Sequence, residues 1–220
     1  MKRTHYIAVL LTITGLLCAC SEAPLPTEST PIAEDLIPYE PEDGKADGYG
    51  FNPHLLIEDA LFEDGNFLTE AQIQSFLENT PYQRRSFLAD YSEGGRLISR
   101  HIYEASQEWR INPLVLLTKL QVESSVVFKE VSPRDSTVEN AMGCGCHDGD
   151  PTCGRGPKGV GPQIRCAASL FRSYLNEIDA ANTTRSGWRV SRQKPTLDDI
   201  QIIPNNRATA ALYTYTPWVL

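Results

Sequence analysis

The stretch Asn112-Pro-Leu-Val-Leu-Leu-Thr-Lys-Leu-Gln-Val-Glu123-Ser124 decides the fold of this chain. Asn112 is a natural N-cap and Pro113 a natural first-turn residue, so a helix is expected to begin here. Its first two turns are apolar nearly all round, which predicts a buried central helix. Glu123 lies late in that helix. A carboxyl in apolar surroundings is easier to keep protonated, which is the state that a glycosidic general acid needs. Alternatively, Glu123 marks only the exposed end of a core helix.

Four further helices are predicted around this one. Thr69-Glu-Ala-Gln72 is a capping box that opens the first of them, and apolar residues at helical spacing define the others. These helices are expected to begin near Thr69, Gly95, Gln163 and Asn206. A short hairpin or extended insert is expected from 188–190 and 200–203. Residues 51–220 can enclose one sizeable core, so the sequence predicts a single, mainly α domain.

Four cysteines fall within this domain: Cys144, Cys146, Cys153 and Cys166. Two disulfides are the expected arrangement in an exported protein, although four cysteines allow three pairings and the sequence does not choose among them. The rival interpretation is a zinc site with His147 as an extra ligand, but Cys-x-Cys-His is not a usual zinc-binding pair. We therefore expect no metal and a glycine-rich loop stapled by disulfides.

The first 19 residues read as an export signal. Lys2 and Arg3 precede an uncharged stretch that is too short to span a bilayer, which takes about 20 residues. The sequence Leu17-Cys-Ala-Cys20 resembles the lipobox of bacterial lipoproteins, with cleavage before Cys20 and acyl chains such as palmitate on its amine and thiol. The alternatives are lipidation at Cys18, or an ordinary signal whose cysteines are incidental. Ser21 resembles the residue that sorts such lipoproteins to the outer membrane.

Residues 20–50 are predicted to be a tether from the lipidated cysteine to the domain. The segment 21–50 holds eight carboxylates, one lysine and five prolines. Such a stretch cannot bury enough apolar surface to offset its chain entropy. The whole chain has a net charge of −8, which argues against a nucleic-acid partner.

The segment Asn112–Ser124 resembles the catalytic segment of soluble-lytic-transglycosylase-type and goose-type lysozyme-like domains. Those domains have an Asn-Pro helix start, a hydrophobic helix and a Glu-Ser pair at its end. The resemblance implies that Glu123 is the catalytic acid/base and that Ser124 is its matching neighbour. It extends over residues 95–220, and it implies a lysozyme-like helical domain with a small extended or β insert.

Two later motifs are also similar to this family. The family has a glycine-containing turn that leads to a glutamine in the glycan cleft. Both Ala141-Met142-Gly143 and Gly159-Val-Gly161-Pro-Gln163 resemble it, and Gly161 with Gln163 is the preferred match. The closing Ala-rich helix with its cleft tyrosine resembles Ala208–Pro217. Because the usual Tyr-Asn-Ala-Gly is absent, either Tyr213 or Tyr215 is the candidate that faces substrate.

The resemblance implies an enzyme that cleaves the β-1,4 bond between N-acetylmuramic acid and N-acetylglucosamine in peptidoglycan. Glu123 would act as both acid and base, with an anhydro product or a hydrolytic one, and no cofactor is implied.

The protein is expected to be a monomer, anchored by lipid to the outer membrane and facing the periplasm. The rival is a non-catalytic lipoprotein that binds glycan or an envelope partner. A conventional glycosidase would need a second carboxylate, for which Asp135, Glu139, Asp148 and Asp150 are the candidates. The alternative interpretation is that these four are solvated loop charges.

Overall fold

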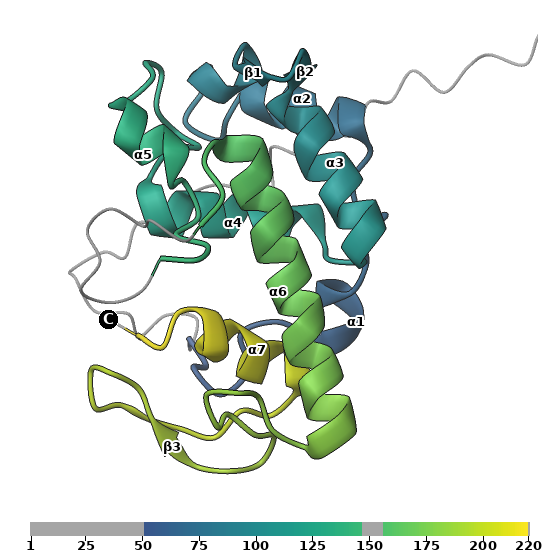
Figure 1. The fold of residues 1–220 in the computed structure, drawn as a ribbon, viewed down its shortest axis with the longest axis vertical. Helices are drawn as coiled ribbons and strands as arrows, with labels where there is room; N and C mark the ends of the chain where they lie inside the picture. The colour runs from purple at the N-terminus through teal and green to yellow at the C-terminus, as the bar shows by residue number, and fades with distance from the viewer. Residues whose placement is uncertain (1–50, 147–155, 220) are drawn as a thin grey trace, which may run out of the picture. The chain divides into compact units, whose positions relative to one another are not determined.

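The central helix forms as its sequence predicts. In the computed structural model, which describes residues 51–146 and 156–219, helix α4 spans Pro113–Ser124. The Asn112 side chain accepts a hydrogen bond from the Leu114 N–H at 2.9 Å, which caps the helix. Leu116, Leu117 and Leu120 are buried among the other helices. Figure 1 shows α4 crossing behind the long helix α6.

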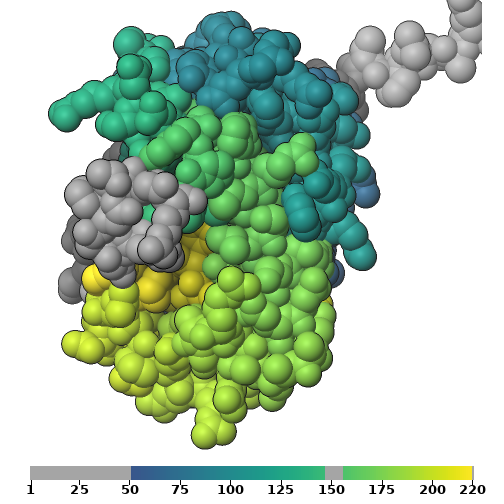
Figure 2. Space-filling view, viewed as in Figure 1, coloured from purple at the N-terminus to yellow at the C-terminus, as the bar shows by residue number. Residues whose placement is uncertain are grey.

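Six more α-helices surround α4 in the described part of the chain. The expected capping box at Thr69 is present and opens α2. Helix α6 begins three residues before its expected start, and its buried face packs against α3 and α7. In Figure 2, residues of α6 lie between the N-terminal helices and the C-terminal segment. The remaining helices are α1 (Asp59–Phe62), α2 (Glu70–Glu78), α3 (Ile98–Trp109), α5 (Asp135–Glu139), α6 (Val160–Ala181) and α7 (Arg207–Tyr215), with a short 3-10 turn at Phe87–Ala89.

Two short hairpins complete the described structure. Strands β1 (Ser92–Glu93) and β2 (Arg96–Leu97) pair antiparallel through a turn in which Gly94 and Gly95 both have positive φ. Strands β3 (Lys194–Pro195) and β4 (Gln201–Ile202) form the expected hairpin. Its first strand lies later than 188–190, and Trp188 is buried in a small second core with Tyr213 and Ile202. The mainly α prediction is therefore confirmed.

Several predictions concern residues outside the described ranges. The signal peptide, Cys20 and the tether to residue 50 all precede the first described residue. His147, Asp148, Asp150 and Cys153 fall in the undescribed stretch 147–155. No helix in the described ranges is both long and apolar enough to cross a membrane.

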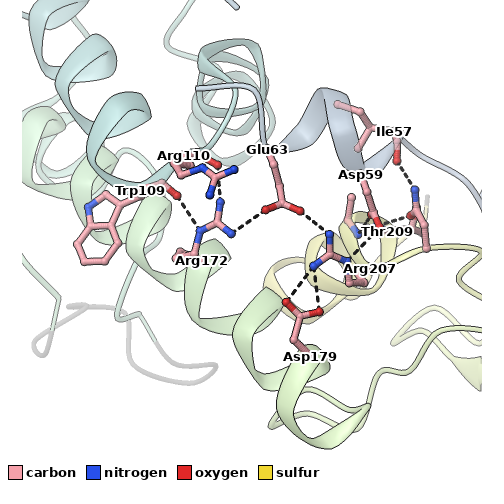
Figure 3. Close-up of polar contacts among 11 residues, drawn as sticks. Ile57, Asp59, Glu63, Trp109, Arg110, Arg172, Asp179, Arg207 and Thr209 are labelled. Carbon is pink, nitrogen blue, oxygen red and sulfur yellow. Dashed lines mark hydrogen bonds and ion pairs between the residues drawn. The ribbon is translucent and has the colours of Figure 1, made fainter. Parts of the chain in front are cut away.

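A network of ion pairs joins α1, α6 and α7 (Figure 3). Glu63 lies at its centre and bonds Arg172 Nη1 at 2.8 Å and Arg207 Nη2 at 2.5 Å. Arg207 also reaches Asp59 and Asp179. The Glu63 side chain is only 17% exposed, so water screens these charges less than it screens surface pairs. The network fixes the start of α7, the helix that carries the C-terminal part of the site.

Replacement of Glu63 should therefore weaken the fold. Glu63→Gln removes the carboxylate that Arg172 contacts and one of the three that Arg207 contacts, and we expect the free energy of unfolding to fall by about 2 kcal/mol. Glu130→Gln is the matched control, because the Arg84–Glu130 pair is 66% and 57% exposed and should contribute less than about 0.5 kcal/mol. Urea unfolding of both variants measures the difference. Equal losses would contradict a stabilising role for the network.

Candidate functional site

Glu123 lies in the last turn of α4 and is held by two donors. Its Oε1 accepts hydrogen bonds from Lys119 Nζ at 2.5 Å and from Thr216 Oγ1 at 2.6 Å. Lys119 Nζ also donates to Thr216 Oγ1. The Glu123 side chain is 23% exposed, whereas that of Lys119 is 6% exposed. The carboxyl thus borders solvent beside a buried ammonium, which differs from the apolar surroundings that the sequence suggests.

The second carboxyl oxygen has a different environment. Oε2 accepts no hydrogen bond from any residue that the structure describes. It faces Gly143, where an added Cβ would lie 3.6 Å from it. Gly143 has a φ of 63°, a conformation that glycine adopts without strain. The two oxygens of Glu123 are therefore unequal: one is occupied by protein donors and the other is not.

Lys119 is enclosed by α4 and α7. Its Nζ lies 4.9 Å from the centre of the Tyr215 ring, a cation–π arrangement. Burial lowers the pKa of Lys119, and the charge and hydrogen bond of Glu123 oppose that shift. Burial also raises the pKa of the Tyr215 phenol well above its usual value, with the Glu123 charge contributing in the same direction. Tyr215 is therefore a neutral hydrogen-bond donor at physiological pH.

The loop of residues 141–144 brings Gly143 to Glu123, and side chains from three helices hold its backbone. Ser124 Oγ donates to the Ala141 carbonyl and Tyr215 OH to the Met142 carbonyl, each at 2.7 Å. Gln163 Oε1 accepts from the N–H groups of Met142 and Cys144, and its Nε2 donates to the Cys144 carbonyl. These bonds fix the position of the loop backbone relative to the end of α4.

A disulfide adds a covalent link to the same loop. Cys144 is bonded to Cys166 on α6, which confirms that these two cysteines form a disulfide; the sequence left their pairing open. Cys146 is disulfide-bonded as well. The loop is therefore stapled directly to the helix that also carries Gln163.

Three expected substrate-binding positions make structural contacts, although Tyr213 also lines the apolar groove beside the ion pair. Gln163 is fully buried and its amide is used by the 141–144 loop, so the expectation that it lines the glycan cleft is wrong. Gly161 does not face Glu123: its N–H donates to Glu93, and a Cβ would lie 2.7 Å from the His101 ring. Tyr213 is 2% exposed and its OH donates to the Pro53 carbonyl.

The other two expected substrate-binding positions lie beside Glu123 but have their hydroxyls engaged. Ser124 and Tyr215 both donate to the 141–144 loop. Gly143, the glycine of the less favoured motif match, is the one that faces the carboxyl. Asp135 and Glu139, the candidates for a second acid within the described ranges, make no hydrogen bond or ion pair with Glu123, Lys119 or Thr216.

An apolar groove of about 420 Å3 adjoins the ion pair. Lys119 and Thr216 contribute to its wall, together with the α4 face that carries Leu114, Thr118 and Val122. Trp218 and Phe51 also line it and are 51% and 61% exposed. The described residues that line the groove do not include Glu123 or Gly143, so the groove offers aromatic surface on the side of the carboxyl where Lys119 and Thr216 lie.

Lys119 and Thr216 were not predicted as site residues from the sequence. Lys119 precedes Glu123 by one helical turn, and this i,i+4 spacing alone could have indicated the pair. Nothing in the sequence signals Thr216, which lies 93 residues further along the chain.

Comparison of the chain with protein-family models, with curated proteins and with solved structures finds no match.

The role of Gln163 in holding the loop can be tested directly. Gln163→Met keeps the side-chain length but leaves the buried Met142 and Cys144 polar groups without partners, so the free energy of unfolding should fall by about 2–4 kcal/mol. Gln193→Met is the control, since Gln193 bonds only Gln201 at the surface and should change stability by less than about 0.5 kcal/mol. Chemical denaturation measures both. Unchanged stability of Gln163→Met would contradict the assigned role.

Proposed function

We propose that this protein cleaves the β-1,4 bond between N-acetylmuramic acid and N-acetylglucosamine in peptidoglycan, with Glu123 as its single acid/base. The observation that carries the proposal is the asymmetry of the Glu123 carboxyl: Oε1 is fixed by two donors, and Oε2 accepts no hydrogen bond from the described residues. A carboxyl held at one oxygen and open at the other has the geometry of a group that exchanges a proton with a bound substrate.

The mechanism needs only one carboxyl. Protonated Glu123 donates to the glycosidic oxygen as the bond breaks, and the acetamido group of the substrate stabilises the developing cation. Glu123, now a carboxylate, takes a proton from the nucleophile. If the nucleophile is the muramyl 6-hydroxyl, an anhydro product forms, and if it is water, hydrolysis results.

Other features support the same proposal. A mainly helical domain with Glu123 at the end of its central helix is compatible with a lysozyme-like fold. Exposed Trp218 in the adjoining groove can stack on a sugar ring. An export signal with lipidation at Cys20 would place the domain at the outer membrane, where the tether would let it reach peptidoglycan.

One contact favours a second candidate, a non-catalytic lipoprotein that binds glycan or an envelope partner. Glu123 forms an ion pair with Lys119, whereas a general acid must be protonated when the bond breaks. A binding protein has no such requirement, so the ion pair is compatible with it.

Loss of the Glu123 carboxyl separates the two candidates. The full chain, purified in detergent with its disulfides intact, is incubated with purified peptidoglycan, and soluble products are identified by mass spectrometry. We expect Glu123→Gln to reduce product formation at least about 100-fold, because general acid–base catalysis contributes on that scale. Glu130→Gln, which removes an exposed carboxylate elsewhere, should retain full activity.

The products also decide the reaction type. Muropeptides lighter by one water indicate a lytic transglycosylase, and muropeptides with reducing ends indicate a hydrolase. Equal product formation by wild-type and Glu123→Gln protein would contradict the role of Glu123. Folded wild-type protein that yields no products but retains peptidoglycan in a pull-down would support the binding candidate instead.

A further inference from the structure

The apolar groove between α4 and the C-terminal segment has exposed side chains along its wall. Four large apolar residues that line it are exposed: Phe51, Leu56, Val122 and Trp218. The described residues expose eleven such side chains in all, so more than a third of them gather at this one place. Single exposed apolar residues are ordinary on a protein surface, whereas a contiguous group of them usually marks a contact site.

Backbone hydrogen bonds bring two more exposed apolar residues next to the groove. The Leu197 N–H donates to the Pro217 carbonyl at 2.8 Å, in the C-terminal segment. The Ile203 N–H donates to His54 Nδ1 at 3.0 Å, in the segment that begins at Phe51. The exposed residues at this place are named the apolar patch: Phe51, Leu56, Val122, Leu197, Ile203 and Trp218. The patch joins segments from both ends of the described chain with α4.

The groove at the centre of the patch holds little charge. Lys119 is the one charged residue among the described residues that line it, and its ammonium is paired with Glu123. A partner recognised by its charge therefore meets no unpaired ion in this part of the wall. What the groove offers is the burial of apolar surface, which is favourable whatever the charge of the partner.

The side chains of the patch suit the boundary between a membrane and water. The indole of Trp218 has an apolar body and one N–H donor, so it is favoured where one part of the ring contacts hydrocarbon and the other stays near water. Phe51 and Val122 carry no polar group that would have to be dehydrated. Apolar surfaces of this kind enter a bilayer by about 5–10 Å, to the boundary of headgroups and acyl chains.

The predicted tether joins the domain at the patch. Phe51 is the first described residue, and residues 20–50, which begin with the expected lipid-bearing Cys20, precede it directly. A short tether gives a binding surface an effective concentration on the order of millimolar. Because the attachment point belongs to the patch, the patch can meet the anchoring membrane without the tether passing around the domain. This placement favours lipid over other apolar partners.

We propose that the apolar patch docks the domain on the surface of a phospholipid bilayer, with Phe51, Val122 and Trp218 in contact with the acyl chains. This docking goes beyond the proposed function, because it gives the chain a second membrane contact besides the lipid on Cys20. Trp218 cannot contact lipid and a sugar ring at once, so the docked domain and the glycan-bound domain are alternative states.

Quenching by brominated lipid measures this contact. The full chain is reconstituted into vesicles of phosphatidylcholine whose acyl chains carry bromine, which quenches the fluorescence of tryptophan only at close range. We expect Trp218 to be quenched, whereas Trp109 and Trp188 do not line the groove. Trp218→Phe keeps an aromatic ring in the patch, so docking persists, but most of the quenching should be lost because the reporter is gone.

Removal of one patch side chain should weaken the docking. For Phe51→Ser we expect the ratio of docked to free domain, obtained from the quenching of Trp218, to fall about tenfold. Phe67→Ser is the matched control, because Phe67 is also exposed, at 43%, but does not line the groove, and it should leave the ratio unchanged. Thermal unfolding shows that both variants are folded. Because apolar burial drives the contact, quenching should persist from about 0.1 to 1 M salt.

Every other outcome overturns the inference. An unquenched Trp218 in the wild type, or a ratio that Phe51→Ser leaves unchanged, would show that the patch does not meet lipid. Quenching that is abolished at high salt would show a contact made by headgroup charge. Trp218 emission that responds to the number of chains per vesicle but not to bromine would assign the patch to a second copy of the chain. None of these measurements contains peptidoglycan, so their result is independent of whether the protein cleaves glycan.

Discussion

The backbone of residues 141–144 is held from three sides, and the geometry of the site depends on that hold. Ser124, Gln163 and Tyr215 reach it from α4, α6 and α7, and Cys144 is bonded to Cys166. Backbone polar groups buried without partners are costly, so this set of bonds selects one position for the loop. That position places Gly143 beside Glu123 Oε2 with no side chain between them.

The end of α4 combines two requirements that normally conflict. Its apolar face must be buried to hold the helices together, yet its last turn must present a charged group to solvent. The long side chain of Lys119 meets both needs, because its stem lies in the core and its ammonium reaches Glu123 at the edge. The same ammonium also reaches Thr216, just after α7, and Thr216 donates to Glu123, so the C-terminal segment is tied to the end of α4.

Local sequence signals predicted the helices well. The Asn112–Pro113 start and the capping box at Thr69 are both present, and α7 begins beside Asn206 as expected, because capping depends on residues only two or three positions apart. The buried roles of Gln163 and Tyr213 were not predictable in this way. Both depend on partners far along the chain, Met142 for Gln163 and Pro53 for Tyr213, and no local pattern encodes such contacts.

The same reasoning explains which part of the site the sequence could indicate. Glu123 stands out because it ends an apolar helix, but the contact with Thr216 exists only after α7 has packed.

The most direct test of the proposal that Glu123 acts on a glycosidic bond is a crystal structure of Glu123→Gln with a soluble peptidoglycan tetrasaccharide. We expect a glycosidic oxygen within about 3.2 Å of the side chain at position 123, on the side facing Gly143. A glycan bound away from this side chain would contradict it.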